Sequence, residues 1–131
     1  CLKKNISKKI GVATGYSKVQ GLNKKYLDSS TVFLLKSKKS NQALLFFRGM
    51  QSELYKTYEQ LKHIGLYAYT KDALERFNKY KRGSLEVSES LEQMRFIENK
   101  EKIICTEVTD SIFAVDYPSD IKKIVNFLKK K

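Results

Sequence analysis

The stretch with the clearest chemical potential is 62–69, which carries the only histidine of the chain and two tyrosines. Successive side chains of an extended strand point to opposite faces, so His63, Tyr67 and Tyr69 would share one face with Gly65. A glycine on that face indicates that some group approaches the backbone closely. The pattern therefore predicts a strand that lines a polar site. Tyrosine packing around a structural histidine is the plain alternative.

Two charged residues fall at the ends of predicted strands. Arg48 ends the apolar run 43–47, and Asp116 follows the apolar run 112–115 just before a predicted helix. A guanidinium suits recognition of a carboxylate or phosphate, because it can bind two oxygens at once. The carboxylate of Asp116 suits a hard cation such as magnesium, or it caps the helix that follows. In α/β sheets ligands gather beyond the carboxyl ends of strands, so both residues are site candidates.

Glu92 and Gln93 are neighbours on a predicted helix. They lie about 100° apart around its axis, so they cannot both be buried with Leu91 and Met94. Glu92 would form a surface ion pair with Arg95, three residues further on. Alternatively, the pair reaches across to the hydroxyl groups of a polar ligand.

Several other kinds of site find no support in the sequence. The early glycines, 11, 15 and 21, lack the spacing of phosphate-binding loops. A single histidine and the absence of a G-x-S-x-G elbow argue against a nucleophilic triad. Cys1 and Cys105 have no spacing typical of a metal or redox pair, so we expect Cys105 to be a buried thiol in a reducing compartment such as the cytoplasm.

The elements that would carry these residues alternate between strands and helices. Apolar runs at 31–36 and 42–48 predict a β-hairpin, and 103–108 predicts a further strand. Residues 1–30 are interpreted as irregular, and 49–61 fits either a helix or a loop. Helices are predicted over 71–82 with Thr70 as cap, from Ser84 or Ser88 to Asn99, and from Pro118 onward with the stripe Ile121, Ile124, Val125 and Leu128. This order predicts an α/β protein, a sheet with helices packed on it and a hairpin adding antiparallel strands.

Length, composition and charge limit the remaining function classes. The chain has 131 residues, 41% of them hydrophobic, and no linker, so we expect one soluble domain. The net charge of +12 comes from lysines near the two ends, whereas the arginines lie in a nearly neutral middle. Without a nucleic-acid-reading motif, such lysines are typical of solvated surface, so neither a nucleic-acid nor a membrane partner is predicted.

Four segments taken in order resemble a known family. They are ALLFFR at 43–48, HIGLYAY at 63–69, ESLEQMR at 89–95 and VDYPSD at 115–120. Together they look like the C-terminal half of 3-deoxy-manno-octulosonate cytidylyltransferases, the CMP-Kdo synthetases of Gram-negative bacteria, over about 32–125. The resemblance implies an incomplete Rossmann-like nucleotidyltransferase with a mixed sheet. Members of that family join CTP to the acid sugar Kdo for lipopolysaccharide biosynthesis, and they release pyrophosphate with the help of magnesium.

The resemblance also implies roles for single residues. It assigns to the sugar pocket Arg48, His63, Tyr67, Glu92 and Gln93, and it makes Asp116 a magnesium-binding carboxylate. Members of the family are homodimers. We therefore expect residues 1–131 to be a single domain, the sugar-binding and dimerising half of such an enzyme, inactive without the nucleotide-binding half. The alternatives are a cytidylyltransferase for another nonulosonic acid, of the acylneuraminate type, and a non-catalytic basic binding or dimerisation module.

Overall fold

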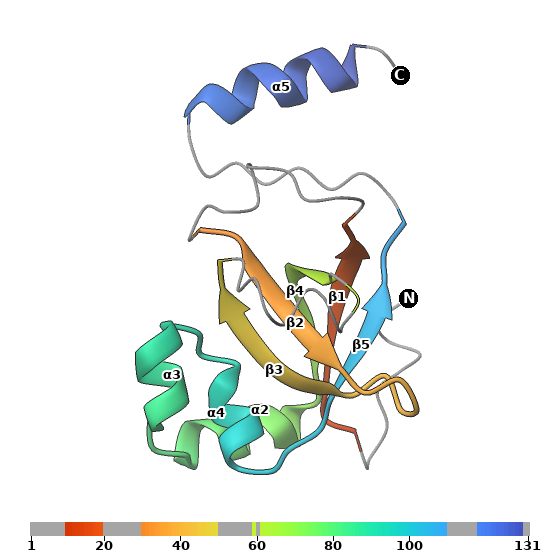
Figure 1. Ribbon diagram of the computed structural model, residues 1–131. Coiled ribbons are helices and arrows are strands. Elements are labelled where there is room, and N and C mark those ends of the chain that lie inside the picture. Colours follow the sequence, from red (N-terminus) through yellow and green to blue (C-terminus); the bar gives the residue numbers. More distant parts are fainter. Residues whose placement is uncertain (1–9, 20–29, 50–58, 60, 110–117, 130–131) are drawn as a thin grey trace.

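A mixed five-stranded sheet forms the centre of the protein, as a computed structural model shows for residues 10–19, 30–49, 59, 61–109 and 118–129 (Figure 1). The strands are β1 (Val12–Lys18), β2 (Val32–Lys36), β3 (Ala43–Arg48), β4 (Leu61–Tyr69) and β5 (Ile103–Glu107). Their order across the sheet is β3-β2-β4-β1-β5. The hairpin β2–β3 is antiparallel, and β1 runs antiparallel to β4 but parallel to β5. The predicted hairpin, the strand at 103–108 and the α/β class are confirmed.

The prediction that residues 1–30 are irregular is wrong for β1. This strand pairs with β4 on one side and β5 on the other, and Val12, Ala13 and Thr14 are completely buried. A strand covered on both faces has no alternation of polar and apolar side chains, so the usual strand pattern is missing from its sequence. Gly11 adds to the ambiguity, yet a Cβ there would lie 2.6 Å from the Cβ of Ala73. The glycine therefore lets α2 (Lys71–Lys79) pack closely on the start of β1.

Two helices begin where the sequence predicts. The Thr70 side chain caps α2, because its hydroxyl oxygen accepts a hydrogen bond from the backbone N–H of Ala73 at 3.2 Å. The backbone N–H of Thr70 donates to the carbonyl of Gly11 at 2.8 Å, which ties the helix to β1. Pro118 occupies the first position of α5 (Pro118–Leu128). Both starts confirm the capping signals in the sequence.

The predicted helix from Ser84 or Ser88 to Asn99 is wrong in its continuity. The chain instead forms α3 (Ser84–Glu89) and α4 (Met94–Glu98), separated at Ser90, which has a left-handed φ of 53°. The side chain of Glu86 is buried in an ion pair, while the apolar side chain of the next residue, Val87, is 59% exposed. Burial of the glutamate rotates α3 away from the orientation that an apolar stripe would require. The left-handed residue after α4 is Lys100 rather than Asn99.

The core lies between the sheet and the side chains of α4. Its largest completely buried side chains include Leu34, Phe46, Met94, Phe96 and Ile103. Cys105 belongs to the same cluster, and its burial raises the pKa of its thiol to about 12, so the prediction of a buried thiol is confirmed. The backbone N–H of Cys105 donates to the carbonyl of Asn41 at 2.8 Å, which joins the β2–β3 turn to β5.

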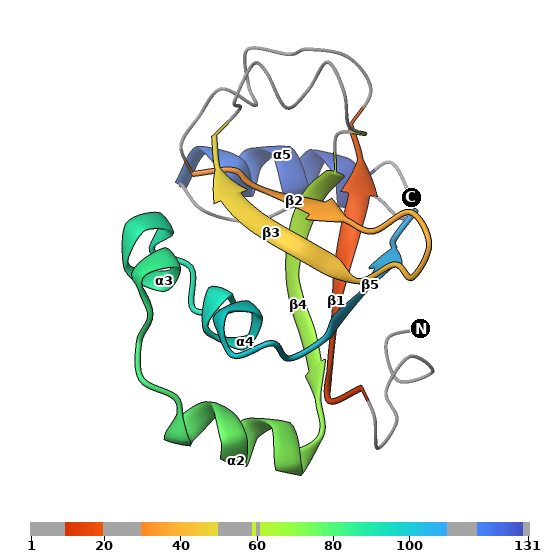
Figure 2. The ribbon, with the colours of Figure 1, turned by 60° about the horizontal axis from the view of Figure 1, so that its bottom comes forward.

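The helices occupy different ends of the sheet. Seen from two directions, α2 lies at one end and α5 at the other, while α3 and α4 lie beside β3 (Figures 1 and 2). The apolar stripe of α5 leaves Ile121, Val125 and Leu128 between 42% and 63% exposed. In the part of the chain that the structure describes, no helix combines the length and apolar character needed to cross a membrane.

Candidate functional site

A cavity of about 270 Å³ lies between the end of β4 and the turn that joins α3 to α4. It is lined by Tyr67, Tyr69, Phe77, Glu92, Gln93, Arg95 and Phe96. Ligand pockets in proteins start at about 300 Å³ and combine aromatic walls with a few polar groups, so this cavity is at the small end of that range. Three of the residues predicted for the sugar pocket, Tyr67, Glu92 and Gln93, meet here. They come from different elements, and the break between α3 and α4 places the last two at the cavity.

A row of aromatic rings forms one wall of the cavity. The rings of His63 and Tyr67 lie 5.4 Å apart, Tyr67 stacks on Tyr69 at 5.5 Å, and Tyr69 stacks on Phe96 at 5.9 Å. The three residues of β4 therefore share a face, as their alternating positions predict. Tyr69 was predicted on the face of the strand that lines a site, and it does line the cavity. Phe96 was not predicted as a lining residue, because an aromatic side chain on a helix usually belongs to the core.

The phenol of Tyr67 is the most incompletely satisfied polar group of the site. Its hydroxyl is buried and has no partner at hydrogen-bonding geometry within the described ranges. Burial, with the neighbouring Tyr69 as a smaller cause, raises the pKa of Tyr67 well above its usual value, although the nearby Thr14 side chain slightly lowers this pKa. The hydroxyl is therefore neutral and can both donate and accept a hydrogen bond. A buried hydroxyl without a partner is unusual in a folded protein, and a bound polar ligand would satisfy it.

His63 is not among the residues that line the cavity, but its ring lies next to the ring of Tyr67, which does. Its Nε2 atom is 3.0 Å from the hydroxyl oxygen of Thr14, and its ring meets the ring of Phe46 edge-on at 5.1 Å. Burial lowers the pKa of His63 to about 4, so the imidazole is neutral at physiological pH. Thr14 was missed by the sequence analysis, because its strand was interpreted as irregular.

The expectation that a group approaches the backbone at Gly65 is wrong. A Cβ built on Gly65 would have no atom within 4 Å. The register of β1 against β4 shifts here, because Thr14 pairs with Tyr67 and the next residue, Gly15, pairs with Ile64. The extra residues of β4 form a bulge, and Leu66 within it is 54% exposed.

Arg48 is placed beside the cavity but does not line it. Its Nε donates to the carbonyl of Glu89 at 3.0 Å, and its Nη2 donates to the carbonyl of Ser90 at 3.2 Å. Its backbone N–H also donates to the Glu89 carboxylate at 3.1 Å. Arg48 therefore satisfies carbonyls at the end of α3 and anchors the turn that carries Glu92 to the edge strand β3.

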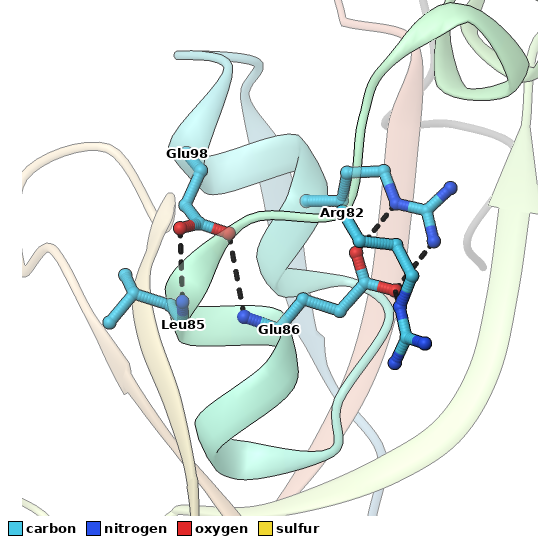
Figure 3. A network of polar contacts seen from close by, with 5 residues as sticks. Arg82, Leu85, Glu86 and Glu98 are labelled. Carbon is cyan, nitrogen blue, oxygen red and sulfur yellow. Dashed lines mark hydrogen bonds and ion pairs between the residues drawn. The ribbon is translucent and has the colours of Figure 1, made fainter.

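Arg95 is the lining arginine, and a buried carboxylate holds it in place. Both oxygens of Glu86, which is 1% exposed, accept hydrogen bonds from Arg95, at 2.5 and 2.6 Å. Arg82 approaches the same carboxylate at 3.1 Å from the solvent side (Figure 3). The guanidinium of Arg95 also lies 4.2 Å from the centre of the Phe77 ring. Arg95 thus pairs with Glu86 rather than with Glu92, which is exposed and free to face a ligand.

A second carboxylate connects the two short helices. Glu98 of α4 accepts hydrogen bonds from the backbone N–H groups of Leu85 at 3.0 Å and Glu86 at 3.4 Å, at the start of α3 (Figure 3). A Cβ at Gly83 would lie 2.0 Å from this carboxylate, so the glycine leaves the space that Glu98 needs. Together with the Glu86 pair, this contact fixes the two helices on either side of the turn that carries Glu92 and Gln93.

The predicted magnesium ligand, Asp116, lies outside the described residues. Among those residues, no group of three or more His, Cys, Asp or Glu side chains is arranged to hold a metal ion. The side chains that line the cavity include a single carboxylate, Glu92. The described site therefore does not by itself fit a magnesium ion.

Comparison with known proteins relates the chain to one group of enzymes. No protein-family model matches it. A 3-deoxy-manno-octulosonate cytidylyltransferase from Paramagnetospirillum magneticum is 46% identical over 67 residues, which are 51% of this chain and 27% of that protein. The cytidylyltransferase of the same name from Parabacteroides distasonis is 33% identical over 101 residues, 71% of this chain and 40% of that protein.

The fold is similar to a solved structure of the same activity. The structure of CMP:2-keto-3-deoxy-manno-octonic acid synthetase complexed with CTP superimposes with a TM-score of 0.84 and 26% sequence identity. The match covers 98% of this chain and 54% of that one. The chain therefore spans about half of the solved structure, and less than half of the relatives named above.

Proposed function

We propose, on the premise that this chain is similar in sequence and in fold to 3-deoxy-manno-octulosonate cytidylyltransferases, that it forms the acid-sugar pocket of such an enzyme. The resemblance inferred from the four segments, and the Rossmann-like nucleotidyltransferase fold, are confirmed by these relatives. The reaction proposed for the whole protein joins CTP to Kdo and releases pyrophosphate, for lipopolysaccharide biosynthesis. The described residues would contribute sugar recognition to it.

The observation that carries the proposal is the convergence of Tyr67, Glu92 and Gln93 on one cavity. The hydroxyl groups of a sugar need both donors and acceptors. Glu92 accepts, Gln93 does both through its amide, and the unpartnered hydroxyl of Tyr67 does both as well. Gln93 is 8% exposed, so its hydrogen bonds to a ligand would be protected from water. This set of groups supports binding of a polyhydroxylated ligand.

The negative charge of an acid sugar needs a cation at the same place. Arg95 brings a guanidinium to the cavity wall, and Glu86 and Phe77 hold it there. We therefore assign the sugar carboxylate to the side of the cavity that Arg95 occupies. Direct contact between Arg48 and the sugar stays a prediction, since the guanidinium of Arg48 is bound to carbonyls at the end of α3. We propose no step that passes through magnesium, and the role of Asp116 also stays a prediction.

The proposal is tested by measuring sugar binding to the 131-residue chain with titration calorimetry. We expect Kdo to bind and N-acetylneuraminate to bind more weakly. Gln93→Ala should weaken Kdo binding about tenfold, because a buried donor and acceptor are lost. Lys81→Ala, an exposed change outside the cavity, serves as the matched control and should leave affinity unchanged.

Three results would contradict the assignment. Absence of Kdo binding, or equal affinity of wild type and Gln93→Ala, would remove the cavity as the sugar site. Tighter binding of N-acetylneuraminate would favour the acylneuraminate-type alternative. For the complete reaction, a protein in which this chain is joined to a nucleotide-binding half should release pyrophosphate from CTP only when Kdo is present, and Asp116→Ala should abolish that release.

A further inference from the structure

The hydroxyl of Thr14 lies at the centre of a buried hydrogen-bonded group. Its oxygen is 3.0 Å from Nε2 of His63, 3.0 Å from the carbonyl oxygen of Leu66 and 3.3 Å from that of Ile64. Thr14 is completely buried on β1, an interior strand between β4 and β5. The two carbonyls belong to the part of β4 where the strand register shifts. The threonine therefore reaches into the β4 bulge and meets the histidine on the same strand.

The one proton of the Thr14 hydroxyl determines the direction of its hydrogen bonds. A threonine hydroxyl has one proton to donate, whereas a carbonyl oxygen can only accept. A separation of 3.0 Å between the hydroxyl and the Leu66 carbonyl is a hydrogen bond when the hydroxyl proton lies between the two oxygens. The hydroxyl oxygen can then only accept from His63, so Nε2 must carry a proton. The opposite arrangement, with the hydroxyl proton directed at Nε2, would leave the hydroxyl oxygen and the Leu66 carbonyl oxygen 3.0 Å apart with no proton between them.

We propose that Thr14 is a positioning residue that holds His63 as the neutral imidazole with its proton on Nε2, so that Nδ1 can only accept a hydrogen bond. A ligand group that reaches His63 must then be a donor. Under the function proposed above, on which this second half rests, His63 would recognise a hydroxyl of the acid sugar and not its carboxylate. Thr14 would act on the sugar only through His63.

The surroundings of His63 support a fixed neutral state. Phe46 covers one edge of the ring at 5.1 Å, and Tyr67 lies 5.4 Å away on the side of the cavity. Both neighbours are uncharged, and Thr14 supplies the polar contact. The pKa of His63 is lowered by burial, with no carboxylate among the causes, so nothing here favours the doubly protonated ring at neutral pH.

The proposal is tested by nuclear magnetic resonance of the full chain with ¹⁵N-labelled histidine. His63 is the only histidine, so its ring nitrogens are assigned without ambiguity. We expect, without any ligand at pH 7, the shift of a protonated nitrogen at Nε2 and that of an unprotonated nitrogen at Nδ1. The reverse pattern, or fast averaging between both tautomers in the wild type, would overturn the proposal directly and needs no variant.

Two substitutions then assign the effect to Thr14. Thr14→Val has the same shape but no acceptor, and it should lower the preference for the Nε2–H tautomer about tenfold. Thr14→Ser keeps the hydroxyl and should restore the wild-type pattern, which a purely structural role of the threonine methyl would not do. An unchanged tautomer ratio in Thr14→Val would overturn the assignment. If Thr14→Val does not fold, Thr14→Ser decides. The serine keeps the hydroxyl, so loss of the Nε2–H pattern in that variant would overturn the assignment.

Addition of Kdo separates this inference from the proposed function. Binding through a sugar hydroxyl should shift the Nδ1 resonance while Nε2 stays protonated. If Kdo leaves both nitrogens unchanged but the Thr14 dependence persists, the positioning role stands and the sugar contact fails. If Kdo binds and His63 becomes doubly protonated, the carboxylate is the group that reaches it, and the proposal that Nδ1 accepts from a hydroxyl is refuted.

Discussion

A single buried imidazole makes the stability of this protein sensitive to acid. The pKa of His63 is lowered from 6.5 to about 4 by burial, so the unfolded chain binds a proton that the folded chain excludes. A group that must stay neutral in the folded state contributes stability that is lost as the pH falls below its unfolded pKa. The relevant window for His63 is therefore from about pH 6.5 down to pH 4.

We predict that lowering the pH from 7 to 5 reduces the free energy of unfolding by about 2 kcal/mol through His63. Urea denaturation at both pH values measures the change. His63→Gln cannot titrate, and because it keeps every carboxylate it should lose only this part of the pH dependence. Equal pH dependence in the wild type and in His63→Gln would show that the folded imidazole is not shielded.

His63 shows why a residue with functional potential can be identified from the sequence while its position in the fold cannot. His63 carries an obvious functional signal as the one histidine of the chain. Its partners, Thr14 and Phe46, are 49 and 17 residues away and belong to other strands. Tertiary packing places the imidazole between Phe46 and Tyr67, and only the distances in the folded chain show this.

At the scale of elements, two short helices replace the long helix that the sequence favours. Leu91 and Met94 do recur at helical spacing and are both buried. However, the turn after Ser90 allows Arg95 to return to the carboxylate of Glu86. Helix propensity does not include the free energy gained when a buried carboxylate pairs with an arginine nine residues later. That pairing determines the path of the chain between α3 and α4.

We predict that the two arginines around Glu86 differ strongly in their contribution to stability. Arg95 is 16% exposed at its side chain and Arg82 is 65% exposed, although both pair with the same carboxylate. Arg95→Gln should lower the free energy of unfolding by about 3 kcal/mol, because it leaves a buried charge poorly compensated. Arg82→Gln should change it by no more than about 1 kcal/mol. Thermal and urea denaturation of the two variants provide the measurement, and equal losses would contradict the role given to Arg95.

At the scale of the whole molecule, the exposed stripe of α5 bears on the expected homodimer. Ile121 and Leu128 are 53% and 63% exposed, which is more apolar exposure than one surface helix usually retains. The homodimer implied by the family resemblance stays a prediction. If a second copy covers this stripe, the interface is formed by a helix whose apolar face is not packed against the sheet of its own chain.

We predict that Ile121→Asp disrupts the homodimer, since a carboxylate would be buried at the interface without a partner. Light scattering after size exclusion should give a mass near twice the 15.2 kDa of the chain for the wild type and the single-chain mass for the variant. Lys122→Asp changes charge on the same helix and should leave the dimer intact. A wild type that stays monomeric at high concentration would refute the prediction.

The sequence alone was sufficient for the elements with clear local signals. The β2–β3 hairpin, the strand β4, the cap at Thr70 and the start of α5 at Pro118 follow from alternation, capping and proline geometry, which act over a few residues. The order of four short segments was enough to identify the related enzymes. The sequence also supplied Tyr67, Glu92 and Gln93 as candidates, because the family resemblance assigns these positions to the sugar pocket.

The tertiary structure alone decided which of these residues meet. Burial on both faces removes the pattern that would reveal β1, so this interior strand and its Thr14 are found only from the strand pairing in the fold. The ion pair between Glu86 and Arg95 forms across the turn that brings Glu92 and Gln93 to the cavity. Arg48, 41 residues before Glu89, anchors that turn, while Arg95 lines the cavity. These outcomes depend on contacts between residues far apart in the chain, whose energies no local pattern records.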